Sequence, residues 1–348
     1  MPLADRALVV GINRYPKIGE LLGAQNDADD FYAWVTDPAG GGVAPANALL
    51  LRSVDFQPPP ADPDDERPDK VLIEKFFTGI DNAANANNLA GQGLKAGNRL
   101  WLFFSGHGFA PSLDRSAVLM ANATNDRPHS IAAMAWANRL FDGGWFNDVL
   151  LFQDACRNPI GDTDLTPPFL KSRQAPAAQQ RRRFYAFSAK NRQLSKELTV
   201  AGRVNGVFTY TLLEGLRGQA RDPQTGAVTT AQLKAYLQEN MRKLLPQTDL
   251  DDASIAKMPE VFDPDPFDVV SAPAGPVPDF PVQILGTEGM AVRVIDAALR
   301  VVAASNPAPD PWSVRLQRGF FKAVRADGRD KLFEVSGGGI AGGVDVHF

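Results

Sequence analysis

Short apolar runs that alternate with helical patterns constrain the fold of this chain most. Ala7–Ile12, Leu100–Phe104 and Val149–Phe152 contain no charged side chain. Strands of this kind are typical of a parallel sheet that is buried on both faces. Between them, Ala24–Val35 and Lys70–Asn82 place apolar residues at helical spacing. The pattern predicts an α/β fold with a mostly parallel sheet flanked by helices.

Further segments extend this alternation. Two short strands and three helices are expected, at Ala48–Leu51, Phe184–Phe187, Ile131–Phe141, Val207–Leu216 and Thr230–Leu245. A threonine hydroxyl can accept a hydrogen bond from an N–H of the first helical turn. Thr229 or Thr230 is therefore expected to cap the last of these helices.

A proline-rich stretch divides the chain. Ser271–Pro281 is typical of a semi-rigid linker, so residues 1–270 are expected to form the α/β domain. Residues 282–348 contain short strand-like runs separated by turns such as Ala326–Gly328. This pattern predicts a small C-terminal antiparallel β-sandwich.

Composition excludes several classes of partner. The net charge of −4 provides no basic field for direct nucleic-acid binding. No apolar run is long enough to span a membrane, and Met1–Gly11 lacks the pattern of a signal peptide. The single cysteine cannot form an internal disulfide or a cysteine-rich zinc site, and it fits a reducing compartment. A cytoplasmic protein is expected.

Two reactive side chains follow two of the predicted strands. His107 lies in Ser105-Gly-His-Gly108, directly after one strand, and Cys156 follows Asp148–Phe152 by four residues. Chemistry in such sheets gathers beyond the carboxyl ends of the strands, so neighbouring strands would bring the two side chains together. An imidazole can take the proton of a thiol and later protonate a leaving amine. We expect Cys156 to be a nucleophile and His107 its base.

The glycines beside His107 point to a further feature of the site. Glycine lets the backbone approach a substrate closely, so the N–H groups of Gly108 and Cys156 are candidates for an oxyanion hole.

Taken alone, a single cysteine after a strand is more often a small core residue. The joint position of His107 and Cys156 in one α/β pattern favours the catalytic interpretation.

Four motifs in order resemble the caspase-like superfamily of cysteine peptidases, in particular its metacaspase-like and bacterial branch. They are Val9–Tyr15, Leu22–Ala28, Ser105–Gly108 and Asp154–Cys156, and the later Phe187–Ala189 and Gly206–Tyr210 are also similar. The resemblance covers roughly Arg6 to Leu245. It implies a caspase-like fold.

The resemblance also implies roles for individual residues. His107 and Cys156 match the catalytic dyad, and Gly108 with the N–H of Cys156 matches the oxyanion hole. Asp27 and Asp154 match two acidic positions of the metacaspase S1 pocket, which holds the residue before the scissile bond (P1). Paired carboxylates would favour arginine over lysine there. The alternatives are helix N-terminal stabilisation for Asp27 and a structural hydrogen bond for Asp154.

The sequence departs from metacaspases at two points. Ala24 stands where many of them carry a second cysteine. Their calcium-binding acidic cluster has no clear match between Phe109 and Asn147. We therefore expect no metal and no other cofactor, and we do not expect activation by calcium.

A long basic segment follows the candidate nucleophile. Residues 157–183 are predicted to form a loop, and loops of this length are usually functional or disordered. In the resembled family this segment is often cut during activation. Candidate processing sites are Lys171, Arg173, Arg181, Arg182 and Arg183. The alternative is a charged loop that only favours solubility.

Two functions remain open at this stage. The first is an endopeptidase acting on protein substrates, controlled by its own cleavage, an upstream protease or a regulatory complex. The resemblance would admit a role in bacterial signalling or anti-phage defence. The second is a catalytically inactive scaffold that acts through its C-terminal β-module. A nucleotide-binding protein is disfavoured because no G-x-G-x-x-G motif or P-loop follows the first strand.

Overall fold

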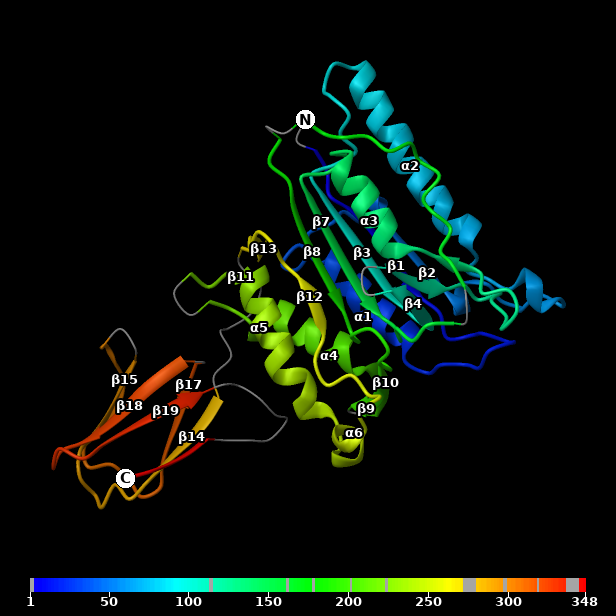
Figure 1. The fold of residues 1–348 in the computed structure, drawn as a ribbon. Helices are drawn as coiled ribbons and strands as arrows, with labels where there is room; N and C mark the ends of the chain where they lie inside the picture. Colours follow the sequence, from blue (N-terminus) through cyan, green and yellow to red (C-terminus); the bar gives the residue numbers. More distant parts are fainter. Residues whose placement is uncertain are drawn as a thin grey trace.

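A mostly parallel sheet organises the N-terminal part of the chain (Figure 1). The computed structural model describes residues 3–112, 115–160, 163–176, 179–200, 202–222, 225–271, 280–296, 299–317, 319–335 and 344–348. Six strands form this sheet in the order β12-β8-β7-β3-β1-β2. They are β1 (Arg6–Gly11), β2 (Ala48–Arg52), β3 (Arg99–Ser105), β7 (Asp148–Asp154), β8 (Arg182–Phe187) and β12 (Glu260–Phe262). All neighbours are parallel except β12, which is antiparallel to β8. The predicted fold class is confirmed.

Helices cover both faces of the sheet, which explains why its strands are apolar throughout (Figure 1). Leu102 and Phe104 of β3 lie in a core with α2 (Lys70–Leu89) and α3 (Ala133–Asp142). Their neighbours Trp101 and Phe103 point to the other face. That second core includes α1 (Ala24–Thr36), α4 (Val207–Glu214) and α5 (Thr230–Asn240). Successive side chains of a strand alternate between faces, so each face of β3 had to be apolar.

The predicted helices are present with altered ends. Helix α2 continues to Leu89, beyond the predicted Asn82. Helix α4 ends at Glu214 and a π-helical turn follows. Helix α5 ends at Asn240 and passes into a 3₁₀ turn. Its N-cap is Thr229, whose hydroxyl accepts a hydrogen bond from the N–H of Gln232 at 3.2 Å, so the first of the two predicted caps is confirmed.

Several short elements were not predicted. A small sheet joins β4 (Gly108–Ser112), β5 (Arg115–Leu119) and β6 (Ser130–Ile131). Strands β9 (Glu197–Val200) and β10 (Arg203–Gly206) form a hairpin, and β11 (Val228–Thr229) pairs with β13 (Asp268–Val270). The short helix α6 spans Gln247–Asp251. Strands of two to five residues carry too little periodicity to be recognised in a single sequence.

The C-terminal module has its own core, to which two sheets contribute. One sheet has the order β17-β14-β20 and the other β16-β15-β18-β19. Their strands are β14 (Phe280–Leu285), β15 (Val292–Asp296), β16 (Val301–Ser305), β17 (Trp312–Leu316), β18 (Gly319–Arg325), β19 (Asp330–Val335) and β20 (Val344–His347). The predicted sandwich is present, but β14 and β20 run parallel, so it is not wholly antiparallel.

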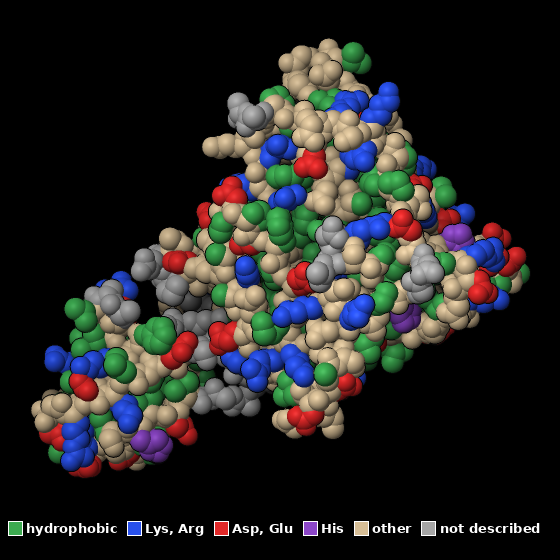
Figure 2. All heavy atoms as spheres, viewed as in Figure 1, with side chains coloured by type: hydrophobic (Ala, Val, Ile, Leu, Met, Phe, Trp, Pro, Cys, Tyr) green, Lys and Arg blue, Asp and Glu red, His purple; other side chains and the backbone are tan. Residues whose placement is uncertain are grey.

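The predicted linker is only partly covered by the structure. Residues 272–279 lie outside the described ranges. Phe280 and Pro281 already belong to β14, so the linker ends earlier than the proline pattern indicated. On the face drawn in Figure 2, acidic and basic side chains are interspersed, as expected for a chain of small net charge.

Candidate active site

The segments that carry His107 and Cys156 leave adjacent strands at the same edge of the sheet. Strands β3 and β7 pair in parallel, with Ser105 opposite Asp154. Beyond this pair, the N–H of Gly106 donates to the carbonyl of Asp154 at 3.1 Å. A Cβ on Gly108 would lie 3.0 Å from the carbonyl oxygen of Cys156 and closer still to Ala155, so only glycine fits. The inferred proximity of the two strands is therefore present in the structure.

The ring of His107 is held in one tautomer. Its Nε2 lies 2.9 Å from the carbonyl oxygen of Gly19, and a carbonyl can only accept, so Nε2 carries the hydrogen. In the neutral ring this leaves Nδ1 as the proton acceptor. Gly19 has φ +105°, a conformation that favours glycine. Gly19 could not be identified from the sequence, because its contribution is a backbone carbonyl.

Tyr15 also contacts this histidine, through its ring and its hydroxyl. The two ring centroids are 4.7 Å apart. The Tyr15 hydroxyl accepts from the N–H of His107 at 3.0 Å and donates to the carbonyl of Leu119 at 3.2 Å. A Cβ on Gly106 would collide with this hydroxyl. The glycine before His107 is therefore required by the tyrosine that positions it.

The thiol of Cys156 is partly buried. Burial raises its pKa, and the carboxylates of Asp154 and Glu197 raise it further, whereas a hydrogen bond from the N–H of Ser195 lowers it. The thiol is thus protonated at rest near neutral pH. Since only the thiolate attacks well, the site needs a proton acceptor during reaction.

Asp27 is a buried carboxylate in the first turn of α1, with 1% of its surface exposed. It accepts hydrogen bonds from the Ser105 hydroxyl at 2.8 Å, the Asn205 amide at 3.1 Å and the Gly206 N–H at 2.9 Å. Burial and the neighbouring Asp154 carboxylate raise the pKa of Asp27 well above its ordinary range.

Asp154 lies at the end of β7 with 5% of its surface exposed. Its Oδ1 accepts from the Ser195 hydroxyl at 2.6 Å. Its Oδ2 accepts from the N–H of Thr209 at 3.0 Å and from the Thr209 hydroxyl at 2.7 Å. Burial raises the pKa of Asp154, although these hydrogen bonds offset part of the rise.

The two carboxylates converge on Gly206. A Cβ there would collide with Oδ2 of Asp154 and lie 2.9 Å from Oδ2 of Asp27. The structure therefore brings together the two residues that were assigned to one pocket from the sequence, and Asp154 lies two positions before the candidate nucleophile. The alternative roles, helix stabilisation by Asp27 and a structural hydrogen bond of Asp154, are also consistent with these contacts. Asp27 lies in the first turn of α1, and Asp154 accepts hydrogen bonds from within the domain.

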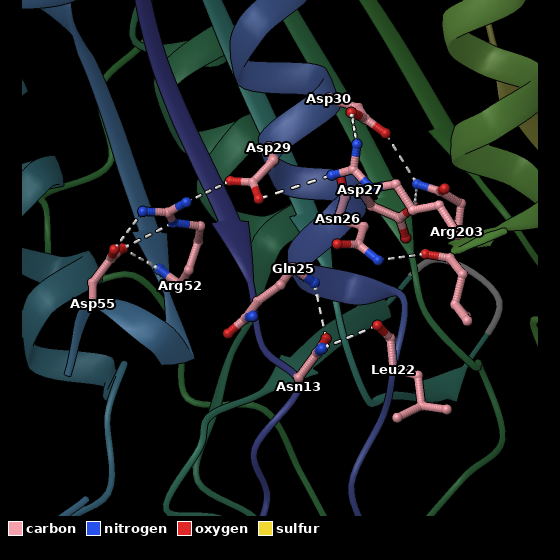
Figure 3. A network of polar contacts seen from close by, with 12 residues as sticks. Asn13, Leu22, Gln25, Asn26, Asp27, Asp29, Asp30, Arg52, Asp55 and Arg203 are labelled. Atoms are coloured by element: carbon pink, nitrogen blue, oxygen red, sulfur yellow. Dashed lines mark hydrogen bonds and ion pairs between the residues drawn. The ribbon is translucent and has the colours of Figure 1, made fainter. Parts of the chain in front are cut away.

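The β9–β10 hairpin, which the sequence analysis missed, holds α1 in place. Glu197 accepts hydrogen bonds from the N–H groups of Gly23 at 2.7 Å and Leu22 at 3.2 Å, where α1 has no side-chain cap of its own. Figure 3 shows Arg203 reaching Asp30, at 2.7 Å. Asn26 donates to the Val204 carbonyl at 2.7 Å. No local sequence pattern predicts these contacts. Ser195 and Glu197 nevertheless lie close in sequence to Phe187–Ala189, a segment that resembles the caspase-like superfamily.

The five candidate processing residues occupy different environments. Lys171 is exposed and Arg173 half-buried, both in irregular backbone. The Arg181 guanidinium donates to the carbonyls of Phe141 and Asp142 at the end of α3. Arg182 and Arg183 belong to β8, so the loop ends before them, which corrects its predicted end at 183. Their backbone is paired with β7, and Arg182 forms an ion pair with Asp148 at 2.8 Å.

The described residues lack two kinds of feature. Within them, no three His, Cys, Asp or Glu side chains are grouped so that they could hold a metal ion. No helix in the same residues has the length and apolar character needed to cross a membrane.

Comparisons with known proteins place this site in context. A family model described as a caspase domain matches residues 4–263. A probable protease from a Desulfuromonadales bacterium is 27% identical over 226 residues, which are 61% of this chain and 26% of that protein. The chain thus spans about a quarter of the length of this curated relative.

Two solved structures are similar at low sequence identity. The crystal structure of caspase-1 from Spodoptera frugiperda has a TM-score of 0.46 and 14% identity, covering 76% of this chain and 88% of that one. The structure of pro-sf-caspase-1 has a TM-score of 0.41 and 13% identity, covering 75% and 91% respectively.

Proposed function

Because this chain belongs to the caspase-domain family, we propose that it is a cysteine endopeptidase that cleaves proteins after basic residues, arginine in preference to lysine. The observation that carries the specificity is the buried pair Asp27 and Asp154 beside Cys156. His107 and Cys156 are the proposed catalytic dyad.

The chemistry follows from the proton positions. Nδ1 of His107 accepts the Cys156 proton as sulfur attacks the scissile carbonyl carbon. The N–H groups of Gly108 and Cys156 donate hydrogen bonds to the carbonyl oxygen as negative charge develops on it. The tetrahedral intermediate collapses to a thioester, and His107 gives its proton to the leaving amine. Water, deprotonated by His107, then hydrolyses the thioester and restores the thiol.

The carboxylate pair explains why P1 is basic. Two buried carboxylates repel each other, and a bound cation between them removes that repulsion. A guanidinium presents a planar fork of donors that can bond both carboxylates, whereas an ammonium is a point charge. Arginine is therefore preferred to lysine.

Cleavage in the basic loop is part of the proposed control. Lys171 offers an exposed basic residue in irregular backbone, and Arg173 and Arg181 lie in the same loop. Arg182 and Arg183 are weaker candidates, because a protease would have to pull a paired strand out of the sheet to reach them. Cutting is performed by the enzyme itself or by an upstream protease or regulatory complex.

The cellular setting belongs to the proposal as well. A nucleophilic thiol must stay reduced, which favours the cytoplasm. The partners are protein substrates and an upstream activator, with no direct nucleic-acid or membrane contact and no metal. A role in bacterial signalling or anti-phage defence rests on the family resemblance.

A peptide library tests the specificity. Wild type and the Cys156→Ala variant are incubated with the library and with each other, and products are mapped by mass spectrometry. We expect cleavage after arginine and, more slowly, lysine, with none by the variant. Cleavage after acidic or small residues contradicts the pocket assignment.

One observation favours the scaffold alternative. The C-terminal module exposes several large apolar side chains, including Phe320 at 65% and Leu332 at 77%, which suits an interaction surface. If the wild type cleaves no peptide and no protein, before or after cutting of its loop, the scaffold function replaces the peptidase proposal.

A further inference from the structure

The hydroxyl of Tyr15 takes the place of a backbone hydrogen bond between β4 and β5. His107 and Leu119 lie opposite each other, one position beyond the paired residues Gly108 and Val118. In a regular antiparallel ladder, a hydrogen-bonded pair of opposed residues exchanges both N–H···O bonds. Here the N–H of Leu119 donates directly to the carbonyl of His107 at 2.8 Å. The N–H of His107 reaches the Leu119 carbonyl only through the Tyr15 hydroxyl, which accepts at 3.0 Å and donates at 3.2 Å.

This hydroxyl has a single way to make both bonds. Tyr15 is fully buried, and a hydroxyl has one hydrogen to donate. That hydrogen is used on the Leu119 carbonyl, so the oxygen accepts from the N–H of His107. Burial raises the pKa of Tyr15, so the hydroxyl keeps its hydrogen near neutral pH. The backbone of His107 is therefore held at a fixed distance from β5.

The main chain of the same tyrosine holds the group that contacts the histidine ring. The Tyr15 carbonyl accepts from the N–H groups of Ile18 at 3.2 Å and Gly19 at 3.1 Å, which closes a tight turn. This turn presents the Gly19 carbonyl to Nε2 of His107 at 2.9 Å. Tyr15, Gly19 and His107 thus form a closed circuit of hydrogen bonds, which fixes the histidine at its backbone and at its ring.

Without the hydroxyl, the circuit opens at the backbone of His107. The N–H of His107 and the carbonyl of Leu119 would both lose their partner, which is costly away from water. They can bond each other only if β4 moves toward β5. The turn at Gly19 does not follow this movement, because the main chain of Tyr15 holds it. The contact between Nε2 and the Gly19 carbonyl is then lost, and with it the acceptor that selects the tautomer.

We propose that Tyr15 is a positioning residue that sets the tautomer of His107: its hydroxyl, inserted between β4 and β5, holds the histidine where Nε2 donates to Gly19 and Nδ1 is left to accept a proton. For its effect on catalysis, this inference rests on the proposed peptidase function. The tautomer itself is a property of the resting protein, so it can be measured whether or not the protein cleaves peptides.

The tautomer is tested by comparing wild type with Tyr15→Phe, which keeps the aromatic ring and the main-chain carbonyl. NMR of protein labelled with ¹⁵N in histidine shows which imidazole nitrogen carries the hydrogen, at a pH at which the ring is neutral. The chain has three histidines, and His129→Gln and His347→Gln assign their signals. We expect the Nε2–H form of His107 to predominate in wild type and to be mixed with the Nδ1–H form in Tyr15→Phe.

The catalytic effect is tested with peptides that differ only at P1, which is arginine or citrulline, its uncharged isostere. The substitution Tyr15→Phe leaves both P1 carboxylates and their hydrogen bonds in place. We expect kcat to fall about 10–100-fold with KM nearly unchanged, because misplacing a catalytic group by an ångström can cost that much. The two peptides should lose activity by the same factor.

A second variant and a matched control accompany Tyr15→Phe. In Gly106→Ala the new Cβ would displace the hydroxyl while Tyr15 itself is kept. This variant should give the same mixture of tautomers, and it carries the test if circular dichroism shows that Tyr15→Phe is not folded. The control is Tyr32→Phe, which removes the hydroxyl of a tyrosine packed against the core on the other face of the sheet. It should change neither the tautomer nor kcat.

Three results would overturn the inference. The first is a wild type in which the Nδ1–H form of His107 predominates. The second is a folded Tyr15→Phe or Gly106→Ala protein that keeps the wild-type tautomer, even if its Tm is lower. The third is a larger loss for the arginine peptide than for the citrulline peptide in Tyr15→Phe, which would place the effect in the P1 pocket. A wild type that cleaves no peptide, but whose tautomer depends on Tyr15 as expected, refutes the proposed function and supports the inference.

Discussion

Two long connections flank strand β8, and they differ in how they contact the rest of the α/β domain. The loop at 155–181 lies against α3, where Arg139 bonds the Leu170 carbonyl and the N–H of Ala175 donates to Asp142 at 2.8 Å. It leaves Phe169 53% exposed. The segment at 188–206 instead supplies buried hydrogen bonds to both candidate specificity carboxylates.

This difference determines which connection can change without altering the site. Beyond the first residues after Cys156, the contacts of loop 155–181 involve α3, Gly144 and Trp145 after it, and Arg115 of β5. Among the described residues, none of these contacts is to Asp27 or Asp154, so a cut there need not move either carboxylate. Segment 188–206 bonds to those carboxylates directly, so any displacement changes the pocket. Substitutions in segment 188–206 should therefore impair the site more than substitutions in loop 155–181.

The strongest perturbation of segment 188–206 is Gly206→Ala. Its Cβ would meet the carboxylates of Asp154 and Asp27, which must move apart. We expect kcat/KM for an arginine peptide to fall at least about a hundredfold, since misplacement by an ångström can cost that much. Gly79→Ala, in open space on α2, is the control and should leave activity unchanged. Unchanged activity in Gly206→Ala would show that the two carboxylates do not act as a pair.

Replacing a carboxylate itself should cost less than moving both. Asp27→Asn can still accept from Gly206 and bond Ser105, so the fold should persist. We expect kcat/KM for arginine peptides to fall about 10–100-fold, because one hydrogen bond to a charged group is lost. Activity on citrulline peptides should change much less. An equal loss on both peptides would make Asp27 a structural residue only.

The same pair predicts a dependence of stability on pH. Both aspartates have pKa values raised in the folded protein, mainly by burial, so they bind protons more readily there than in the unfolded chain. The free energy of unfolding should therefore fall as pH rises from the ordinary aspartate pKa through the raised values. Urea denaturation across pH should show a weaker decline in the Asp27→Asn, Asp154→Asn double variant. Parallel profiles would contradict the shared burial of these groups.

The sheet edge could be predicted from the sequence and segment 188–206 could not, for a physical reason. Strands β3 and β7 are apolar on both faces, and their motifs end in His107 and Cys156, so local pattern and site coincide. The Gly206 N–H reaches Asp27 across 179 positions of sequence. Such a contact depends on the path of the backbone, and β9 is only four residues long. Asp27 and Asp154 could be assigned to one pocket only through the family resemblance.

A smaller effect is expected where the hairpin caps α1. Glu197→Ala removes the acceptor of two N–H groups at the helix start, which should lower the free energy of unfolding by about 1 kcal/mol. Removing this charge also lowers the pKa of Cys156, so alkylation near neutral pH should become faster while stability falls. Glu239→Ala, which breaks an exposed pair with Lys243, is the control and should not change alkylation. Slower alkylation in Glu197→Ala would mean that its main effect is displacement of the thiol.

The smallest effect on intrinsic catalysis is expected in loop 155–181. Replacing Lys171, Arg173 and Arg181 with glutamine should block processing, yet leave the free energy of unfolding within about 1 kcal/mol, because no buried carboxylate is touched. Incubation followed by gel analysis should show an uncut chain with reduced activity. The matched variant replaces Arg182 and Arg183, which lie in β8, and it should still be cut. Full activation of the uncut triple variant would refute control by cleavage. If the same three substitutions instead lower the activity of enzyme whose loop has already been cut, this loop shapes the pocket as segment 188–206 does.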